Sequence, residues 1–382
     1  MKRKRVVIAH GGDISMPVAS TNRVMAFAKA LVDAGFDVYL VIPRPRYKKY
    51  LPKELREGIK IHTVPVEARG VTDQIARALS VLYRAKKVAS RINATIQVEH
   101  SALGGIASIL GVTNYVLDVH DLSFASPLYL KLLFSTFIQK SIYTIEKNAV
   151  TKASRVIVVS NLMKKFLVKQ WRVPEEKIVV IPNGFSQEKI QRVLDKLNKV
   201  EERKIIARTG TLFKHLNVEA LIHLAKSLRN SDVKVLLIGD GPLRSYIEKR
   251  VREKNLKNVI ITGFLPYEKA MRLTLKACVV FECMKKSLTT MVACPVKILD
   301  YVALGKAMAL SDVSEISYEL GRRGGALVSS PDDIERFVEN VHRLLTDEKL
   351  RKCIGRKAKE FVKEYSWEIL GQRLVKVYEE LV

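Results

Sequence analysis

Short apolar runs alternate along the chain with stretches in which apolar residues recur every three or four positions. The run at 5–10 predicts a buried strand, the spacing of Phe27 and Leu31 predicts a helix over 21–34, and a second strand is expected at 37–42. Strands and helices that alternate in this way form parallel sheets covered by helices on both faces. The pattern therefore predicts an α/β fold.

The same alternation continues to 182–184, where Pro182, Asn183 and Gly184 form a turn signal that marks a domain boundary. It predicts strands at 60–64, 95–99, 114–119, 155–160 and 177–181, helices at 73–92 and 128–150, and a helix that carries Met163 and Phe166. The apolar segment 128–150 suits either a core helix or a surface that lies on a membrane.

A second alternation starts after this turn and spans a similar length. Strands are expected at 204–208, 233–238, 259–262, 278–281 and 307–310. Helices are expected at 218–228, in a segment that ends at 253, around Met271 and Leu275, and at 295–306, 332–345 and 347–364. No short-period repeat or low-complexity tract interrupts either half. We therefore expect two successive Rossmann-like domains.

The segment 295–306 combines a cation and a carboxylate on one short helix. Pro295 suits the first helical position, and Gly305 suits the left-handed C-terminal cap. Lys297 and Asp300 stand three residues apart and therefore share a face near the helix N-terminus, whose free amides favour an anion. A nucleotide diphosphate would use the amides and the lysine for its phosphates and the carboxylate for its ribose. The alternative is an amphipathic surface helix with a Lys/Asp pair.

The strand at 114–119 leads into two carboxylates and an imidazole, carried by Asp118, His120 and Asp121. Ligands bind at the carboxyl ends of strands in open α/β sheets, so this strand end is a candidate chemical site. The alternative is a helix-capping aspartate beside a histidine that packs against the sheet.

The chain of 382 residues has a formal net charge of +27, which predicts attraction to nucleic acid, anionic lipid or phosphorylated small molecules. Residues 1–182 carry 29 Lys and Arg against 13 Asp and Glu, an excess of 16, and the other residues contribute the remaining 11. The basic cluster 83–87 and the segment 128–150 are therefore candidates for attachment to an anionic membrane surface. Ordinary solvated or core-packed helix faces are the alternative.

Cysteine spacing and the length of the apolar runs indicate in which cellular compartment the protein works. No two of the four cysteines form a CxxC pair, and no histidine lies at metal-ligand spacing from them. We therefore expect reduced thiols, no disulfide and no metal site. The apolar run at 6–10 is too short for a signal peptide, and no run of about 18 apolar residues predicts a spanning helix. We therefore expect a cytoplasmic protein, with peripheral attachment to the inner face of the membrane as an open option.

The loops after the strands are weak signals one by one, but their order is specific. They are Gly11-Gly12, Val158-Val159-Ser160, Ile181-Pro182-Asn183-Gly184, Gly210, Leu237-Ile238-Gly239-Asp240-Gly241-Pro242, Val259-Ile260-Ile261-Thr262-Gly263-Phe264 and Pro295-Val296-Lys297-Ile298-Leu299-Asp300-Tyr301. This succession resembles glycosyltransferase family 4 over nearly the whole chain, most strongly from about 155 to 312.

The resemblance implies a GT-B fold, in which two Rossmann domains with parallel sheets face each other across a cleft. Residues 1–182 would form the acceptor domain, residues 183–366 the donor domain, and the final helix at 367–382 would pack back on the first domain. The family transfers sugar from a nucleotide-diphosphate sugar with retention of configuration (EC 2.4, hexosyltransferase type). It uses no cofactor or tightly bound metal, so side-chain cations and amides must stabilise the leaving diphosphate.

The resemblance carries several roles over to single residues. Gly11 and Gly12 match the glycine loop that lets the backbone approach the diphosphate sugar, with a plain tight turn as the alternative. Gly263 matches the loop that passes the nucleotide base. Lys297 and Asp300 match the helix whose carboxylate usually grips the ribose.

One departure concerns the carboxylates near the donor. The family commonly has two glutamates eight positions apart, and here Asp300 stands at the second position and Val292 at the first. The donor-sugar carboxylate is therefore either missing, as in some branches, or supplied elsewhere. Glu282 is the candidate substitute.

A second departure concerns the phosphate ligands. The usual basic residues after Gly210 are replaced by Thr211 and Leu216. We therefore expect Arg208 or Lys214 to reach the same phosphates from neighbouring positions, with a solvated loop charge as the alternative.

His120 falls where the family often has a histidine or an acid that lines the sugar. We expect His120 to contact the donor sugar or the reacting hydroxyl, and Asp121 to orient it or to assist deprotonation of the acceptor. The acceptor, which could be lipid-linked, a glycan or a small molecule, is not identified by any motif, nor are the sugar and the base.

Two other functions remain open on this sequence. One is a basic nucleic-acid or phospho-ligand binding protein on a doubled Rossmann scaffold, although no helix-turn-helix, RRM or KH signature and no aromatic-interleaved basic ribbon supports it. The other keeps the GT-B fold but is either a sugar-nucleotide epimerase or a catalytically inactive homologue, and the residue at Val292 suggests the inactive version.

Overall fold

The chain divides into two compact units in the computed structural model, which describes residues 4–16, 18–47, 58–66, 71–125, 135–196 and 203–381. Unit 1 comprises Met1–Asn183 and Trp367–Val382, and unit 2 comprises Gly184–Ser366. The division falls one residue after the boundary that we placed between residues 182 and 183. Both units are α/β.

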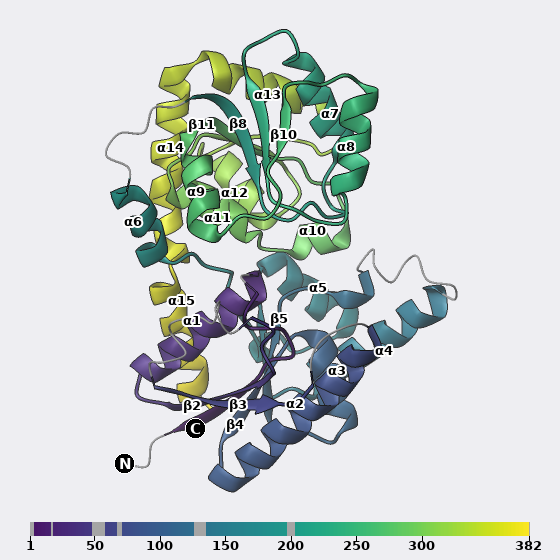
Figure 1. Ribbon diagram of the computed structural model, residues 1–382. Coiled ribbons are helices and arrows are strands. Elements are labelled where there is room, and N and C mark those ends of the chain that lie inside the picture. The colour runs from purple at the N-terminus through teal and green to yellow at the C-terminus, as the bar shows by residue number, and fades with distance from the viewer. Residues whose placement is uncertain are drawn as a thin grey trace. The chain divides into compact units, whose positions relative to one another are not determined.

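Unit 1 is built on a seven-stranded sheet whose pairs all run parallel, in the order β3-β2-β1-β4-β5-β6-β7 (Figure 1). The strands are β1 Arg5–Ala9, β2 Asp37–Pro43, β3 Ile59–Val64, β4 Thr95–Glu99, β5 Tyr115–Val119, β6 Arg155–Val158 and β7 Ile178–Val180. Most of their side chains are buried, because helices cover a parallel sheet on both faces.

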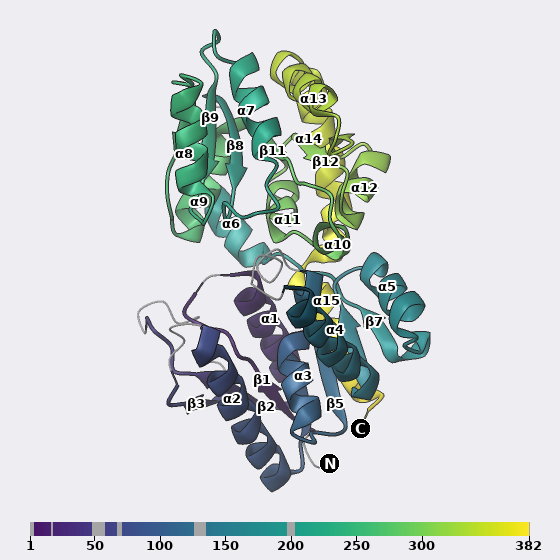
Figure 2. The same ribbon diagram turned by 90° about the vertical axis from the view of Figure 1, so that its right-hand side faces the viewer.

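Five of the helices described in unit 1 form two groups, and α5 (Asn161–Trp171) packs on β6 and β7. The others are α1 Ala19–Asp33, α2 Val71–Ile92, α3 Ser101–Ile109, α4 Ser135–Lys152 and α15 Trp367–Glu379, with short 3₁₀ turns at Ser123–Ala125 and Glu175–Lys177. Helices α2, α3 and α4 lie side by side, whereas α15, from the far end of the chain, packs along α1 (Figure 2). Gly371 of α15 permits this approach, because a Cβ there would lie 2.6 Å from the Cβ of Ala30.

Unit 2 carries a six-stranded parallel sheet in the order β10-β9-β8-β11-β12-β13. The strands are β8 Arg203–Thr209, β9 Lys234–Ile238, β10 Val259–Ile261, β11 Ala277–Glu282, β12 Met308–Ser311 and β13 Leu327–Ser329. The helices are α6 Gln187–Asp195, α7 Val218–Ser227, α8 Arg244–Glu253, α9 Tyr267–Lys276, α10 Leu288–Val292, α11 Val296–Ala303, α12 Glu315–Arg322, α13 Ile334–Thr346 and α14 Glu348–Val362, followed by a 3₁₀ turn at Lys363–Tyr365.

Helix α3 was not predicted, because it contains Gly104 and Gly105 and lacks a helical apolar period. The structure shows what these glycines do. A Cβ on Gly104 would lie 2.6 Å from Leu117 of β5, and one on Gly105 would collide with Ile145 of α4. The glycines therefore let α3 pack closely between a strand and a neighbouring helix.

The segment predicted as a helix over 128–150 is described only from residue 135, where α4 begins. Ala149 and Val150 are fully buried, which fits the core interpretation, whereas the Phe137 side chain at the other end is 74% exposed. The first part of the segment lies outside the described residues. Among the helices that the structure describes, none is both long and apolar enough to cross a bilayer.

Candidate functional site

Three histidines gather at the carboxyl edge of the unit 1 sheet. His10 follows β1, His100 follows β4 and His120 follows β5, and these strands are neighbours. The rings of His100 and His120 have centroids 6.0 Å apart. Only His120 was singled out from the sequence. A histidine at the end of the strand predicted at 5–10, and one directly after the strand predicted at 95–99, were the signals for the other two.

The imidazole of His120 is held between two carboxylates. Its Nε2 lies 3.0 Å from Asp118 Oδ2 and 3.0 Å from Glu99 Oε2. Asp118 and His120 are two residues apart, so the alternation of an extended chain turns them to the same side. Burial acts to lower the pKa of His120, but the attraction of Asp118 and Glu99 outweighs it and raises this pKa to about 9. His120 is therefore an imidazolium at neutral pH.

Asp118 is fixed in turn by a fully buried arginine. Arg23 on α1 donates from Nε to Asp118 Oδ2 (2.7 Å) and from Nη2 to Asp118 Oδ1 (2.8 Å). It also donates to the carbonyl oxygens of Ile181 and Pro182. Burial opposes ionisation of Asp118, but Arg23 and His120 hold the pKa of this carboxyl well below its usual range. An arginine on the apolar stripe of a predicted helix was the signal that sequence reasoning missed.

Glu99, Asp118 and His120 are the one group of possible metal ligands, among the described residues, whose donor atoms lie within 4.8 Å of one another. Both oxygens of Asp118 already accept hydrogen bonds from Arg23, so a metal ion here would face a guanidinium. The donor set does not fit a metal. The cluster is a charged hydrogen-bond network.

Asp121 pairs with a different histidine from the one that we expected it to orient. Its carboxylate lies 2.6 Å from Nε2 of His100, and Asp118 makes the orienting contact to His120. Burial would lower the pKa of His100, but Asp121 raises it. Assistance by Asp121 in deprotonating an acceptor stays a prediction.

Gly12 makes room for the ring of His10. A Cβ on Gly12 would lie 2.6 Å from His10 Nε2, whereas a Cβ on Gly11 would meet Leu103 at an ordinary 3.9 Å. The buried ring of His10 has no hydrogen-bond partner at either nitrogen among the described residues. Burial, with the neighbouring His120 and His100, lowers the pKa of His10 to about 3, so this histidine is neutral.

In unit 2, two cations converge on one buried carboxylate at the strand ends. Arg208 near the end of β8 places Nε 3.2 Å from Glu282 Oε1, and Lys297 on α11 places Nζ 2.9 Å from Glu282 Oε2. Burial acts to raise the pKa of Glu282, but Arg208 and Lys297 lower it. Glu282, our candidate donor-sugar carboxylate, therefore holds two cations in place and leaves the cluster with a net positive charge.

These cations border a cradle of backbone built around Gly210. Arg208 Nη1 donates to the Gly210 carbonyl (3.0 Å), and a Cβ on Gly210 would lie 3.3 Å from Lys297 Cε. The loop after β9 lies directly against it: Leu212 donates its N–H to the Asp240 carbonyl, and a Cβ on Gly241 would lie 2.6 Å from the Leu212 carbonyl oxygen. The N–H of Gly210 donates in turn to the Ile238 carbonyl, so the two loops are joined through their backbones beside the two cations.

Lys214 and Gly263 are the other sequence candidates of this unit. Lys214 is half-buried and follows Phe213 in the segment between β8 and α7. Gly263 has a positive φ of 71°, and a Cβ on it would lie 3.0 Å from Arg244 Nη1. The roles of both residues stay predictions.

Asp300 of α11 is paired with a tyrosine rather than with Lys297. The hydroxyl of Tyr267, at the start of α9, donates to Asp300 Oδ1 (2.8 Å). Burial raises the pKa of Asp300 to about 7, against the lowering effect of the Tyr267 hydrogen bond. No described residue hydrogen-bonds Asp300 Oδ2, so this oxygen can accept from a ligand hydroxyl. Tyr267 was missed because no local pattern links it to a residue 33 positions away.

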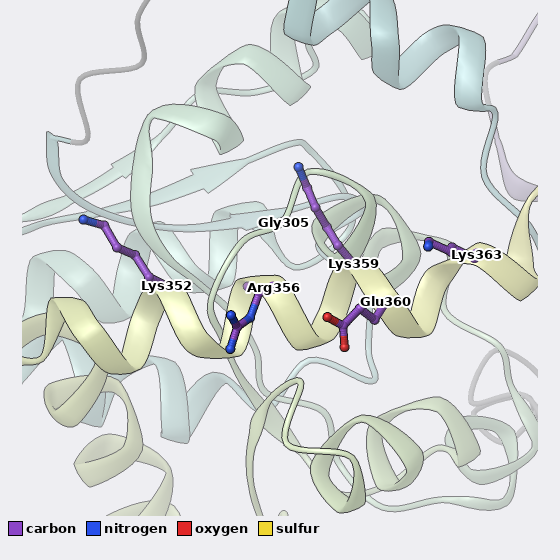
Figure 3. A pocket seen from close by; sticks show the side chains of 7 residues that line it. Gly305, Lys352, Arg356, Lys359, Glu360 and Lys363 are labelled. Carbon is purple, nitrogen blue, oxygen red and sulfur yellow. The ribbon is translucent and has the colours of Figure 1, made fainter.

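A shallow hollow lies where α11 ends against α14. Gly305, with a positive φ of 68°, follows the end of α11 as predicted. The side chain of Lys359 lies over it (Figure 3). Lys352, Arg356 and Lys359 of α14 line this hollow together with Lys363 of the 3₁₀ turn that follows. A Cβ on Gly355 would collide with the Gly305 carbonyl, so the two glycines let α14 support the turn after α11.

Two family profiles match the chain, and together they span residues 20–361. Residues 20–189 match Glycosyltransferase Family 4, and residues 189–361 match Glycosyl transferases group 1. The alpha-D-kanosaminyltransferase of Streptomyces kanamyceticus is 23% identical over 87% of this chain and 92% of that protein.

Two further comparisons agree. The N-acetylgalactosamine-N,N'-diacetylbacillosaminyl-diphospho-undecaprenol 4-alpha-N-acetylgalactosaminyltransferase of Campylobacter jejuni is 25% identical over 65% of this chain and 66% of that protein. The crystal structure of Anabaena HepE in complex with UDP and glucose superposes with a TM-score of 0.73 at 16% identity, over 99% of each chain. The loop order, the two parallel sheets and these matches lead to one conclusion. The chain belongs to glycosyltransferase family 4 and has the GT-B fold.

Proposed function

We propose that this glycosyltransferase moves a sugar from a nucleotide-diphosphate sugar to an acceptor with retention of configuration and without a metal ion. Unit 2 would bind the nucleotide diphosphate, and the histidine edge of unit 1 would contact the sugar or the acceptor hydroxyl. HepE, which shares the fold, has been solved with UDP and glucose, so UDP-sugars are the first donors to test.

The observation that carries the proposal is the Arg208–Glu282–Lys297 cluster beside Gly210. When the glycosidic bond to the diphosphate breaks, negative charge grows on the phosphate oxygens. Two cations that a buried carboxylate holds in place stabilise that charge without having to reorganise. This arrangement performs the task for which other enzymes use a metal ion, and it supports metal independence.

Asp300 and Tyr267 suit the ribose. A carboxylate accepts two hydroxyl hydrogen bonds, and the Tyr267 hydroxyl occupies Asp300 Oδ1 while Oδ2 stays available. A shorter aspartate with a tyrosine partner thereby takes the place of the glutamate that the family commonly has here.

His120 acts in this proposal as a hydrogen-bond donor. Both carboxylate contacts reach Nε2, and no described residue hydrogen-bonds Nδ1. A protonated imidazole cannot accept a proton, so His120 would hold a sugar or acceptor oxygen rather than act as a base.

The acceptor that we propose is lipid-linked and lies on an anionic membrane. The Campylobacter relative acts, by its name, on a diphospho-undecaprenol compound. Helix α2 presents exposed apolar side chains at Ile75, Leu79 and Tyr83, spaced four residues apart, next to the exposed Arg84 and Lys87. Apolar side chains flanked by cations suit the interface of an anionic leaflet.

Turnover tests the proposal directly. Release of nucleotide diphosphate would be followed with UDP-, GDP-, ADP- and CMP-sugars, with and without EDTA. We expect one donor class to react at a rate that EDTA leaves unchanged. Lys297→Met should slow the reaction by on the order of 100-fold, as loss of a transition-state cation does, whereas the control Lys226→Met, on the outside of α7, should not.

The anomeric configuration of the product, read by NMR, tests retention. A product with inverted configuration would contradict retention, and a rate abolished by EDTA would contradict metal independence. Selective donor binding without any turnover would favour the inactive homologue.

A further inference from the structure

The C-terminal helix reaches the His120 network through a buried chain of side chains. Tyr378 on α15 donates its hydroxyl to Gln97 Oε1 (2.5 Å), and Gln97 Nε2 donates to Glu99 Oε1 (2.5 Å). The other oxygen of Glu99 lies 3.0 Å from His120 Nε2. Tyr378, Gln97 and Glu99 are almost completely buried, so water does not compete for these contacts.

The hydrogen bonds of this series run from Tyr378 through Gln97 to Glu99. Burial raises the pKa of Tyr378 well above its usual value, so the hydroxyl stays protonated and serves as a donor. The amide of Gln97 has one acceptor oxygen and one donor nitrogen. Because the oxygen accepts from Tyr378, the NH₂ group must face Glu99.

The orientation of Gln97 matters for the charge of Glu99. Burial and the neighbouring Asp118 raise the pKa of Glu99, so this carboxylate is prone to take up a proton. A hydrogen bond from Gln97 stabilises the ionised form. Ionised Glu99 in turn attracts the imidazolium of His120.

We propose that Tyr378 and Gln97 are positioning residues that keep Glu99 ionised and thereby keep His120 protonated as a hydrogen-bond donor. The role of His120 toward the sugar or acceptor rests on the proposed function, but its charge state does not. Helix α15 thus contributes to the chemistry of unit 1 from 281 residues along the chain, in addition to its packing on α1.

Several other groups face His120 and remain unchanged in the experiment. Asp118 on β5 holds the same ring nitrogen, with Arg23 of α1 behind it. His100 and His10, at the ends of β4 and β1, are neighbouring imidazoles, and Asp121 pairs with His100. A change at Tyr378 alters none of these contacts directly. A change in the pKa of His120 would therefore come from the Gln97–Glu99 hydrogen bond.

The test is an NMR titration of the His120 ring between pH 6 and 10, with its signal assigned by its loss in His120→Gln. Tyr378→Phe removes only the hydroxyl and keeps the ring beside Phe36, at 6.1 Å between centroids. We expect the His120 titration midpoint to fall by about half a pH unit or more, because loss of one hydrogen bond weakens the support of Glu99. Gln97→Leu should shift it in the same direction.

The matched control is Tyr115→Phe, which removes another buried hydroxyl of unit 1. Tyr115 donates to the Ala149 carbonyl (2.7 Å) and is not part of this chain of side chains. The control should titrate like the wild type. Titration midpoints that stay at the wild-type value in both Tyr378→Phe and Gln97→Leu would overturn the proposal.

The pH profile of turnover gives a second readout once a donor is known. In Tyr378→Phe, we expect the pH at which turnover falls on the alkaline side to decrease by the same amount as the NMR titration midpoint of His120. If His120 titrates as expected but turnover does not follow it, the positioning inference stands and the catalytic role of His120 fails. The two proposals are therefore separable.

Discussion

Arg23 lies on the buried stripe of α1, where an apolar residue would be expected, and its partner Asp118 is equally buried. A buried ion pair of this kind owes its stability to the completeness of its hydrogen bonds. Removing one partner leaves an uncompensated charge in a medium of low dielectric. Sequence patterns place Arg23 on its helix but do not show a partner 95 residues away.

We predict that Arg23→Met lowers the free energy of unfolding by about 3–5 kcal/mol, the usual cost of breaking a buried pair. Urea denaturation measures this value. The control Lys29→Met removes an exposed cation from the same helix, where the pair with Asp33 should contribute about 0.5 kcal/mol or less. Equal losses in the two variants would mean that the Arg23 pair is not the support described above.

If Asp300 binds the donor as proposed, donor binding should depend on pH. Its pKa of about 7 in the free protein means that a fraction is protonated at neutral pH, and the ionised form is the stronger acceptor of hydroxyl hydrogen bonds. We therefore predict that the calorimetric affinity for the nucleotide rises from pH 6 to pH 8 and then levels off. Asp300→Asn should bind more weakly, with an affinity that is flat over this range. A wild-type affinity that falls over the same interval would refute the ribose assignment.

At the scale of elements, the alternation of strands and helices was readable because the strands of a buried parallel sheet are continuously apolar. The strands at 5–10, 37–42 and 95–99 were predicted to within one residue of β1, β2 and β4. Helices α6, α10 and α12 and strand β13 were missed, as was α3. β13 has three residues at the edge of its sheet, and such a short run carries no period.

The candidate site was predictable only in part, because a local pattern shows where a residue lies on its element but not which distant residue it contacts. Local patterns identified the strand and helix ends where His120, Arg208, Lys297 and Asp300 lie. They did not identify which side chains meet, because contacts such as Tyr267–Asp300 and Tyr378–Gln97 are set by tertiary packing. No local pattern showed the two cationic partners of Glu282, whose role as a candidate donor-sugar carboxylate stays a prediction.

The loops after β8 and β9 should be intolerant of side chains. Gly241 has a positive φ of 156°, and a Cβ there would lie 2.6–2.9 Å from backbone atoms of Leu212. We predict that Gly241→Ala separates these loops and weakens nucleotide binding at least tenfold, since displaced backbone misplaces the cradle at Gly210. Isothermal calorimetry measures the loss.

The control for this prediction is Gly111→Ala. Gly111 has a positive φ of 65°, but a Cβ added there would meet no described atom within 4 Å, so the variant bears only the cost of the left-handed backbone, about 1 kcal/mol. It should bind nucleotide like the wild type. Equal binding by the two glycine variants would contradict the close-approach argument.

At the scale of the whole molecule, the net charge of +27 is distributed over both halves of the chain. Helix α2 carries exposed apolar residues in addition to basic ones. We predict that the protein co-sediments with vesicles that contain anionic lipid and much less with neutral vesicles. Ile75→Ser combined with Tyr83→Ser should reduce this binding severalfold, because each exposed apolar side chain contributes to insertion at the interface.

A matched pair in unit 2 serves as the control for vesicle binding. Ile260 and Tyr246 are also exposed but lie outside α2, so Ile260→Ser with Tyr246→Ser should leave vesicle binding unchanged. Binding that is equal on neutral and anionic vesicles would remove the membrane proposal. The donor chemistry would be unaffected by that result.

The central claim is that unit 2 binds a nucleotide diphosphate through the cations that Glu282 holds beside Gly210. The most direct measurement is calorimetry of the chain with UDP, GDP, ADP and CDP, repeated on Lys297→Met and on Lys226→Met. We predict selective binding of one diphosphate, weakened at least tenfold by Lys297→Met and unchanged by Lys226→Met, since Lys297 lies at the cluster and Lys226 on α7 does not. Failure to bind any diphosphate, or equal binding by wild type and Lys297→Met, would contradict the account.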